Sequence, residues 1–233
     1  MSHNFFTKIL WQDFLSLIYP EICVHCGDNL LKNESYLCTI CLTSLPVTKY
    51  AQEHEQAFFN YFSYLPKVSA AIAYLHFREG GVAQSLLHKL KYKGQPALAV
   101  MLGTYFGRHL MRHGHLEADY LLPIPMHPEK ERKRGYNQSH EICKGLSAVL
   151  NIPIKEQFLV RISDPKTQAT SRVVDRWRQL ENVYLVEQVN LLKGKSVIIV
   201  DDVVTTGATM STICELLSPY VQRIIILAAV TGK

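Results

Sequence analysis

The residues from Lys195 to Met210 read Lys-Ser-Val-Ile-Ile-Val-Asp-Asp-Val-Val-Thr-Thr-Gly-Ala-Thr-Met, and they predict the architecture of the chain. Val197 to Val200 form an apolar, β-branched run with no polar alternation, which is typical of a strand buried on both faces of a parallel sheet. We expect this strand to end at Val200. Asp201 and Asp202 then place two carboxylates at its carboxyl end, the edge where open α/β sheets bind their ligands.

A hydroxyl-rich turn follows the acidic pair and precedes a helix predicted from Met210 to Leu217. Backbone N–H groups and the positive end of the helix dipole converge on such a turn, threonine hydroxyls add donors, and a glycine permits the close approach of a phosphate. The residues predicted to hold a phosphate are Thr205, Thr206, Gly207, Ala208 and Thr209.

The two aspartates need a partner other than the phosphate, because like charges repel. A ribose diol fits, since each carboxylate accepts a hydrogen bond from a vicinal hydroxyl, and one carboxylate can also help to hold a divalent cation. The stretch therefore predicts a ligand with a ribose and a 5-phosphate, with Asp201 and Asp202 at the reacting sugar. The alternative is a buried strand whose aspartates cap a helix and whose threonines fill a turn.

The composition is that of an ordinary globular protein. The chain has 233 residues, 48% hydrophobic and 19% charged, which suits one or two domains. Its net charge of +5 permits a polyanionic ligand or nucleic acid but demands neither. No apolar run approaches the roughly 18 residues of a membrane span. We expect Phe5 to Ile18 to form a short helix packed on the rest of the protein, with membrane contact as the alternative.

Four of the six cysteines form two Cys-x-x-Cys pairs, Cys23-Val-His-Cys26 and Cys38-Thr-Ile-Cys41, with eleven residues between them. Two such knuckles bring four thiolates together as a tetrahedral set for zinc, and a closed four-sulfur site is expected to be structural. Two disulfides are the alternative, although a Cys-x-x-Cys bridge is strained and the surrounding sequence carries no secretory mark. Reduced cysteines of this kind favour the cytoplasm.

The chain divides into three segments. Residues 1–46 are predicted to be an N-terminal helix and a zinc ribbon, residues 47–67 a linker of which part packs on the main domain, and residues 68–233 an α/β domain. Strands and helices alternate in the last segment, which predicts a parallel sheet. The strands are expected at Val68–His76, Asp119–Pro125, 183–186, Val197–Val200 and Ile224–Val230, and the helices at Val82–Lys91, Pro96–His113, Gln138–Leu150, Val173–Leu180 and Met210–Leu217.

A basic loop, Glu129 to Gln138, follows the strand predicted to end at Pro125. It should leave the same sheet edge as Asp201 and so collect positive charge opposite the acidic pair. We interpret it as a pyrophosphate site, and the alternative is a solvated charge run. A second loop, from Phe158 to Arg172, has no periodicity and is predicted to be mobile. The cations expected to meet pyrophosphate are Lys130, Arg132 and Arg134.

Further motifs stand in a fixed order along the chain. After the cysteine knuckles come Lys-Tyr-Lys-Gly at 91–94, Pro-Ile-Pro-Met-His-Pro at 123–128, Arg-Gly-Tyr-Asn-Gln at 134–138 and Lys-Thr-Gln at 166–168. The acidic stretch resembles the signature of type I phosphoribosyltransferases, and nearly the whole chain resembles the ComF family. The resemblance implies a type I phosphoribosyltransferase-like domain joined to a zinc ribbon, binding of phosphoribosyl pyrophosphate with magnesium, and a link to natural competence, the uptake of transforming DNA.

The resemblance also implies roles for individual residues. The aspartates would contact the ribose hydroxyls, and the hydroxyl-rich turn would hold the 5-phosphate. The pyrophosphate loop would be Pro125–Pro128, including Met126 and His127. A flexible loop closing over the site would contain Arg161, Lys166, Gln168 and Arg172.

Two hypotheses for function follow. The first is a phosphoribosyltransferase that displaces pyrophosphate at the anomeric carbon with a nitrogen acceptor, which no motif identifies. The second is a non-catalytic competence protein that uses the site only to bind ribose phosphate or nucleic acid, while the zinc ribbon contacts single-stranded DNA or DNA-uptake proteins. Pyrophosphate release with any acceptor favours the first, and steeply salt-dependent binding of single-stranded DNA favours the second.

Overall fold

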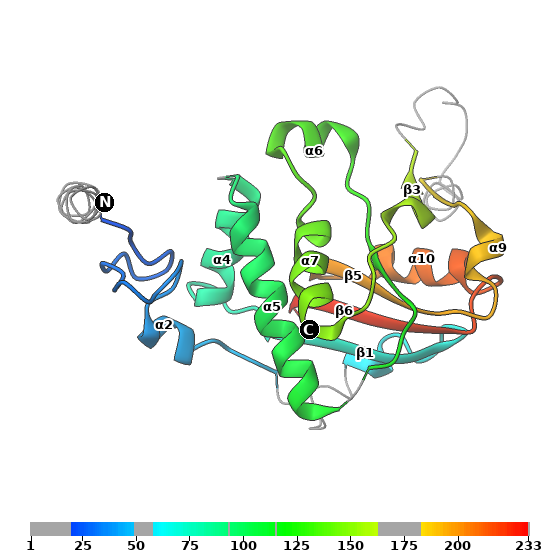
Figure 1. Ribbon diagram of the computed structural model, residues 1–233, viewed down its shortest axis with the longest axis horizontal. Helices are drawn as coiled ribbons and strands as arrows, with labels where there is room; N and C mark the ends of the chain where they lie inside the picture. The colour runs from blue at the N-terminus through cyan, green and yellow to red at the C-terminus, as the bar shows by residue number, and fades with distance from the viewer. Residues whose placement is uncertain (1–19, 49–57, 93, 115, 163–182, 233) are drawn as a thin grey trace, which may run out of the picture.

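Parallel strands and flanking helices build the larger part of the molecule (Figure 1). The computed structural model describes residues 20–48, 58–92, 94–114, 116–162 and 183–232. The strands are β1 (Val68–His76), β2 (Tyr120–Pro123), β3 (Leu159–Arg161), β4 (Tyr184–Val186), β5 (Ser196–Val204) and β6 (Arg223–Thr231), and the helices are α2 (Thr39–Thr43), α4 (Val82–Tyr92), α5 (Pro96–His113), α6 (Pro128–Arg134), α7 (Gln138–Leu150), α9 (Val189–Leu192) and α10 (Ala208–Leu217), with a 3-10 helix at Glu156–Phe158.

The central sheet has the strand order β1-β6-β5-β2, and every neighbouring pair is parallel. β5 and β6 lie in the middle, and the apolar residues 197–200 and 224–230 are almost completely buried, as expected for strands covered on both faces. β2 pairs with β5 from Tyr120 opposite Val197 to Pro123 opposite Val200. β3 and β4 form a separate antiparallel ribbon.

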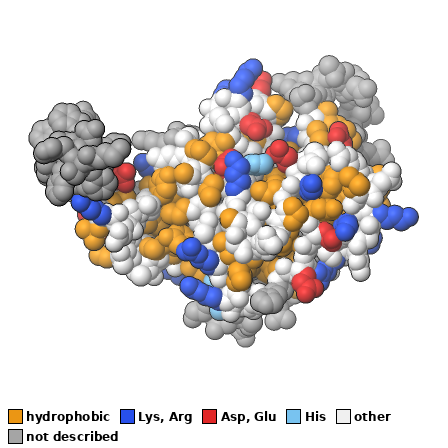
Figure 2. All heavy atoms as spheres, viewed as in Figure 1, with side chains coloured by type: hydrophobic (Ala, Val, Ile, Leu, Met, Phe, Trp, Pro, Cys, Tyr) orange, Lys and Arg blue, Asp and Glu red, His pale blue; other side chains and the backbone are white. Residues whose placement is uncertain are grey.

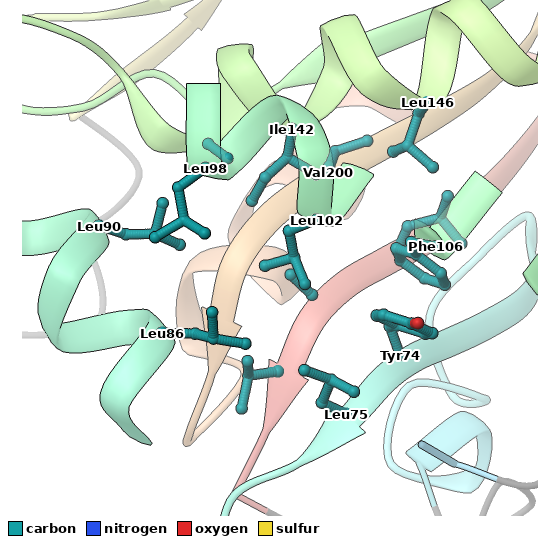
Figure 3. Packing of buried hydrophobic residues seen from close by; sticks show 14 of the residues in the cluster. Tyr74, Leu75, Leu86, Leu90, Leu98, Leu102, Phe106, Ile142, Leu146 and Val200 are labelled. Carbon is teal, nitrogen blue, oxygen red and sulfur yellow. The ribbon is translucent and has the colours of Figure 1, made fainter. Parts of the chain in front are cut away.

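Helices cover both faces of the sheet (Figure 1). α4, α5 and α7 pack on one face against Ile198 and Val200 of β5. α10 packs on the other face against Val197 and Ile199, because successive residues of a strand point to opposite faces. Figure 3 shows the first layer, in which Ile142 of α7 lies beside Val200.

Two glycines allow α5 and α7 to cross in close contact. A Cβ atom added at Gly103 would overlap the carbonyl oxygen of Ile142, and one added at Gly145 would overlap the carbonyl oxygen of Val100. Because neither space accommodates a side chain, the two helix backbones touch. The crossing fixes the position of α7, whose first turn reaches the sheet edge described below.

The structure confirms the predicted central strands and the helices α4, α5, α7 and α10, with differences at their ends. β5 continues through the acidic pair to Val204 instead of ending at Val200, because β6 pairs with it up to Thr231. β2 ends at Pro123, two residues earlier than expected, and α10 begins at Ala208.

Two stretches predicted as loops have regular structure. The basic stretch forms the helix α6, which Pro128 begins and Gly135 ends in a left-handed conformation. Leu159–Arg161, predicted as part of a mobile loop, forms β3 because it pairs with Tyr184–Val186. The helices predicted at 5–18 and 173–180 lie outside the described residues.

Part of the segment predicted as a linker is buried. Val47 forms an antiparallel bridge with Leu75 of β1. Phe58, Phe62 and Leu65 are at most 4% exposed and pack on the same sheet face as α10. Within the described part of the chain, no helix combines the length and the apolar character that a membrane crossing requires.

Candidate functional site

The candidate site lies at the carboxyl ends of the neighbouring strands β2 and β5. After β2 the chain passes through α6 into α7, which covers one face of the sheet, whereas α10, which follows β5, covers the other. A crevice opens between two strands whose connections diverge in this way, and α/β proteins bind ligands there. A pocket of about 250 Å³ fills this position. Its lining includes Lys91, Met126, His127, Lys130, Arg134, Asn137, Gln138, Ser139, Arg161, Tyr184, Asp201, Asp202 and Thr209.

The acidic pair belongs to β5 and faces this pocket. One carboxylate oxygen of Asp201 accepts hydrogen bonds from the Ser139 hydroxyl at 3.0 Å and from the backbone N–H of Asp202 at 2.9 Å. Burial, together with the negative charge of Asp202, raises the pKa of Asp201 to about 8. Asp201 is therefore held by α7, and one of its oxygens is already engaged within the protein.

The loop after β5, residues 205–209, is here called the threonine loop. It surrounds a hollow of about 50 Å³ that Asp201 also lines. Gly207, at φ +72°, precedes the first residue of α10, so the backbone turns sharply into the helix. The N-terminal N–H groups of α10 have no partner within the helix, which makes the hollow a suitable place for an anion.

Residues 124–137, here called the basic finger, leave β2, form α6 and return to α7 (Figure 1). The Nδ1 atom of His127 accepts the N–H of Glu129 at 3.2 Å and so caps α6. No residue of α6 is buried. Lysine and arginine side chains project at the end of the molecule where α6 lies (Figure 2), so this end offers positive charge opposite the acidic pair.

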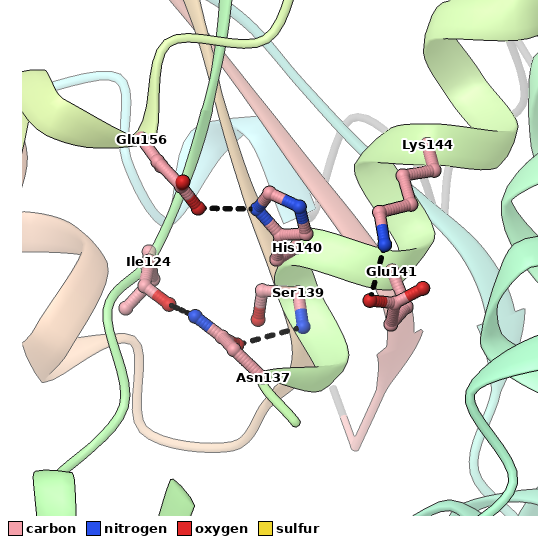
Figure 4. Close-up of polar contacts among 7 residues, drawn as sticks. All are labelled: Ile124, Asn137, Ser139, His140, Glu141, Lys144 and Glu156. Carbon is pink, nitrogen blue, oxygen red and sulfur yellow. Dashed lines mark hydrogen bonds and ion pairs between the residues drawn. The ribbon is translucent and has the colours of Figure 1, made fainter. Parts of the chain in front are cut away.

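Hydrogen bonds at the base hold the basic finger to the rest of the domain. The side-chain amide of Asn137 donates to the carbonyl oxygen of Ile124 at 3.0 Å and accepts the N–H of Ser139 at 3.0 Å, which closes the base of the finger (Figure 4). The Tyr136 hydroxyl and the Gln138 amide both donate to the carbonyl oxygen of Leu90, at 2.7 and 3.1 Å.

Gln138 also connects the base of the finger to its cations. Its Oε1 atom accepts a hydrogen bond from Arg134 at 3.1 Å. The buried amide therefore links Arg134 to the carboxyl end of α4, where Lys91 enters the same pocket.

A second pocket, of about 450 Å³, lies on another side of the basic finger and shares Pro125, Met126, Asn137 and Arg161 with the first. Its polar lining includes His140, whose Nδ1 lies 2.6 Å from a Glu156 carboxylate oxygen, and Glu141, which pairs with Lys144 at 2.7 Å (Figure 4). This pocket is more acidic than the first.

The structure brings most of the predicted site residues together. Met126, His127, Lys130 and Arg134 line the first pocket with the acidic pair, whereas Arg132 lies outside its lining. Arg161 lines both pockets; its guanidinium donates to the Tyr184 hydroxyl at 3.1 Å. The predicted contacts Lys166, Gln168 and Arg172 lie outside the described residues.

Four further lining residues were not singled out from the sequence. Ser139 had been placed only in a helix, and Asn137 and Gln138 in the basic loop without a role of their own. The sequence carried a signal for Asn137, because asparagine is a common cap at the start of a helix. Tyr184 had no local signal, because only the pairing of β4 with β3 brings it to the pocket.

The four knuckle cysteines converge as predicted. Their sulfur atoms all lie within 4.8 Å of one another, and the Cys26 and Cys38 sulfurs are 3.7 Å apart. Tetrahedral zinc with bonds of about 2.3 Å separates its sulfur ligands by about 3.8 Å, so the donor set and its spacing fit zinc. None of the six cysteines forms a disulfide.

The cysteine knuckles also contact the main domain. His25 Nδ1 lies 3.0 Å from the Ser85 hydroxyl of α4. The remaining thiols, Cys143 and Cys214, are buried in helices, and burial raises the pKa of Cys214 to about 12, which suits core packing.

Known proteins resemble the chain at the level of both sequence and fold. The phosphoribosyl transferase domain family matches residues 141–233. Competence protein F of Haemophilus influenzae is 27% identical over 84% of this chain and 90% of its own length. DNA utilization protein YhgH of Escherichia coli O157:H7 is 31% identical over 57% of this chain and 59% of its own length, and competence protein ComFC of Bacillus subtilis is 23% identical over 89% and 82%.

Solved structures with a similar fold have low identity. The allosteric regulatory enzyme of purine biosynthesis matches 56% of this chain and 26% of its own, at 17% identity and a TM-score of 0.42. Adenine phosphoribosyltransferase of Saccharomyces cerevisiae matches 58% and 69%, at 16% identity and a TM-score of 0.37. At such scores neither adds an argument about this chain.

The parallel sheet, the crevice between β2 and β5 and the family match over residues 141–233 define a phosphoribosyltransferase-like protein of type I fold with a four-cysteine N-terminal module. Its relatives are competence proteins and a DNA utilization protein. These similarities support the resemblance of the chain to the ComF family.

Proposed function

We propose that the chain binds phosphoribosyl pyrophosphate with magnesium in the crevice between β2 and β5 and transfers the phosphoribosyl group to a nitrogen acceptor. The convergence of three kinds of group supports this most strongly: two carboxylates, a small hollow at a helix N-terminus and a basic finger, in adjoining pockets. Each group matches one part of the ligand, respectively the ribose diol, the 5-phosphate and the pyrophosphate.

In this proposal the acidic pair binds the sugar. Asp202 accepts hydrogen bonds from the ribose hydroxyls, and the second oxygen of Asp201 completes the contact with the diol, while Ser139 holds Asp201 in place. Carboxylate and pyrophosphate oxygens are ligands that suit magnesium, so the donor set fits that ion. The threonine loop, Thr205 to Thr209, receives the 5-phosphate at the start of α10.

The basic finger takes the leaving group. Lys130 and Arg134 enter the pocket, and positive charge there stabilises the charge that develops on departing pyrophosphate. In the transfer, the bond from the anomeric carbon to a pyrophosphate oxygen breaks, a bond from that carbon to the acceptor nitrogen forms, and the nitrogen releases a proton. We assign closure over the site to the segment that begins at Arg161 and contains Lys166, Gln168 and Arg172.

An Asp202→Asn variant tests the proposal. It keeps the shape of the side chain but removes the charge, so we expect at least a tenfold loss of affinity for phosphoribosyl pyrophosphate in calorimetric titration with magnesium, with an unchanged melting temperature. Glu215→Gln, an exposed carboxylate on α10, is the matched control and should bind as the wild type does. Equal binding by the Asp202→Asn and wild-type proteins would refute the assignment.

We also propose that the four cysteines bind one structural zinc ion in the reducing environment of the cytoplasm. Cys23, Cys38 and Cys41 are buried, and Cys26 closes the set from the surface, which leaves no open position for a substrate. Elemental analysis should find one zinc per chain, and Cys38→Ser should lower that content and the melting temperature together. Full zinc content in this variant would contradict the proposal.

A second candidate function is binding of single-stranded DNA without turnover, in contact with DNA-uptake proteins. It is favoured by the exposed cations of α6, Arg132 and Lys133, which are not part of the pocket lining. If DNA binds there, affinity should fall steeply with salt and should fall further in Arg132→Gln. Pyrophosphate release with an acceptor would favour the transferase.

A further inference from the structure

A segment outside the crevice contacts the threonine loop from behind. Residues 58–65 are fixed in the core by Phe58, Phe62 and Leu65, of which Phe62 is completely buried. The rings of Phe58 and Phe62 meet edge to face, with centroids 5.3 Å apart. Tyr61 lies between these anchors, partly exposed, with its ring 5.1 Å from that of Phe62. A rigid base therefore carries the tyrosine.

Tyr61 contacts the backbone of the threonine loop directly. Its hydroxyl donates a hydrogen bond to the carbonyl oxygen of Thr206. A Cβ atom added at Gly207 would lie 2.5 Å from Cε1 of Tyr61 and 2.9 Å from Cζ of Phe62, so the two rings close this side of the loop. On its other side the loop lines the hollow.

This contact fixes the orientation of one peptide group. The Thr206 carbonyl and the Gly207 N–H belong to the same planar trans peptide and point in opposite directions. Because the Tyr61 hydroxyl holds the carbonyl, the N–H points away from Tyr61, and Gly207 itself lines the hollow. A flipped peptide would bring the negative end of the carbonyl toward a bound phosphate and would lose the hydrogen bond. The left-handed φ of +72° at Gly207 belongs to the observed orientation.

We propose that Tyr61 is a positioning residue for anion binding, which holds the threonine loop in the conformation that receives a sugar phosphate. The inference rests on the proposed function for the ligand's identity. It adds a residue from the predicted linker, more than 140 positions away from the loop in the chain, whose hydroxyl acts on the loop through the Thr206 carbonyl.

A pair of tyrosine variants tests the inference. Tyr61→Phe removes the hydroxyl and keeps the ring. Tyr64→Phe is matched to it, since it removes a hydroxyl from the same segment that donates to Ser211 of α10 at 3.2 Å and not to the loop. We expect Tyr61→Phe to lose about fivefold in affinity for ribose 5-phosphate, and to keep its affinity for pyrophosphate, which the basic finger binds. Tyr64→Phe should bind both as the wild type does.

A second measurement needs no ligand. The ¹⁵N resonance of Gly207 reports the hydrogen bond accepted by the preceding carbonyl, so it should shift in Tyr61→Phe and stay in place in Tyr64→Phe. An unmoved resonance, or equal losses for ribose 5-phosphate and pyrophosphate, would overturn the inference. If the resonance shifts but even the wild type fails to bind ribose 5-phosphate, the proposed function fails and the positioning of the loop by Tyr61 stands.

Discussion

The threonine loop and the basic finger leave neighbouring strands at the same sheet edge but are built in opposite ways. The threonine loop is short, and the rings of Tyr61 and Phe62 close it from behind. The basic finger spans residues 124–137, and its helix has no buried residue; its hydrogen bonds to the domain and its buried side chains, Ile124 and Tyr136, lie at its base. One side of the pocket therefore has a preformed shape, whereas the other contributes charge on a support that tolerates movement.

Two glycines at positive φ provide the sharpest test of this contrast. Gly207 of the threonine loop has φ +72° and no space for a Cβ, whereas Gly135 of the basic finger has φ +83° and nothing within 4 Å of an added Cβ. We expect Gly207→Ala to lose about 3 kcal/mol of stability and most sugar phosphate binding, because strain and overlap with Tyr61 add together. Gly135→Ala should lose only about 1 kcal/mol from backbone strain.

Denaturant unfolding of both glycine variants gives the comparison directly. Equal losses of stability would mean that the rings of Tyr61 and Phe62 do not confine the threonine loop. The contrast between a fitted loop and a loosely supported finger would then be wrong.

Substitution of either of two arginines on the basic finger should have a smaller effect, on pyrophosphate binding. Arg134 lines the pocket and is held by Gln138, whereas Arg132 lies outside the pocket lining on the same helix. We expect Arg134→Gln to weaken pyrophosphate binding about tenfold, and Arg132→Gln to change it less than twofold. Titration at two salt concentrations checks this, and equal effects would show that the finger acts only as a diffuse positive field.

The acidic pair should give a pH effect of a few degrees. The pKa of Asp201, raised by burial and by Asp202 to about 8, lies above that of an unfolded aspartate, so the native protein holds a proton that the unfolded chain has released. The proton on Asp201 stabilises the native state at low pH, and this stabilisation is lost as the pH rises from about 4 to about 8. We expect the melting temperature to fall between pH 5.5 and 9, and to fall less in Asp201→Asn.

The control for the pH effect is Glu187→Gln, an exposed carboxylate after β4, which should follow the wild type across this range. Identical pH profiles for Asp201→Asn and the wild type would show that Asp201 does not retain its proton in the native state.

The sequence predicts the parts of the site whose physics is local. The apolar run Val197–Val200 predicts a buried strand, and the acidic pair followed by the threonine loop predicts a ligand at its end. The cysteine spacing predicts the four-sulfur cluster. These features depend on residues a few positions apart, so the local sequence pattern is enough to predict them.

The remaining parts depend on distant contacts or on exposure. α6 has no apolar face, so periodicity does not reveal it, although Pro128 and Gly135 mark its ends. β3 exists only because Tyr184–Val186 pairs with it. The role proposed for Tyr61 has no sequence signal, because the segment around it resembles a linker until the fold places it against Thr206.

The pairing of β1 with β6 has a consequence for synthesis on the ribosome. Val68 pairs with Ile224, so at about 5–20 residues per second the first strand of the sheet leaves the ribosome roughly 10 to 30 s before its neighbour exists. Residues 46–48, which precede β1 in the chain, cover its other edge through hydrogen bonds from the Thr48 N–H to the Tyr74 carbonyl and from the His76 N–H to the Pro46 carbonyl. One edge of the nascent strand stays open throughout that interval, and there we expect chaperones to bind an incomplete chain.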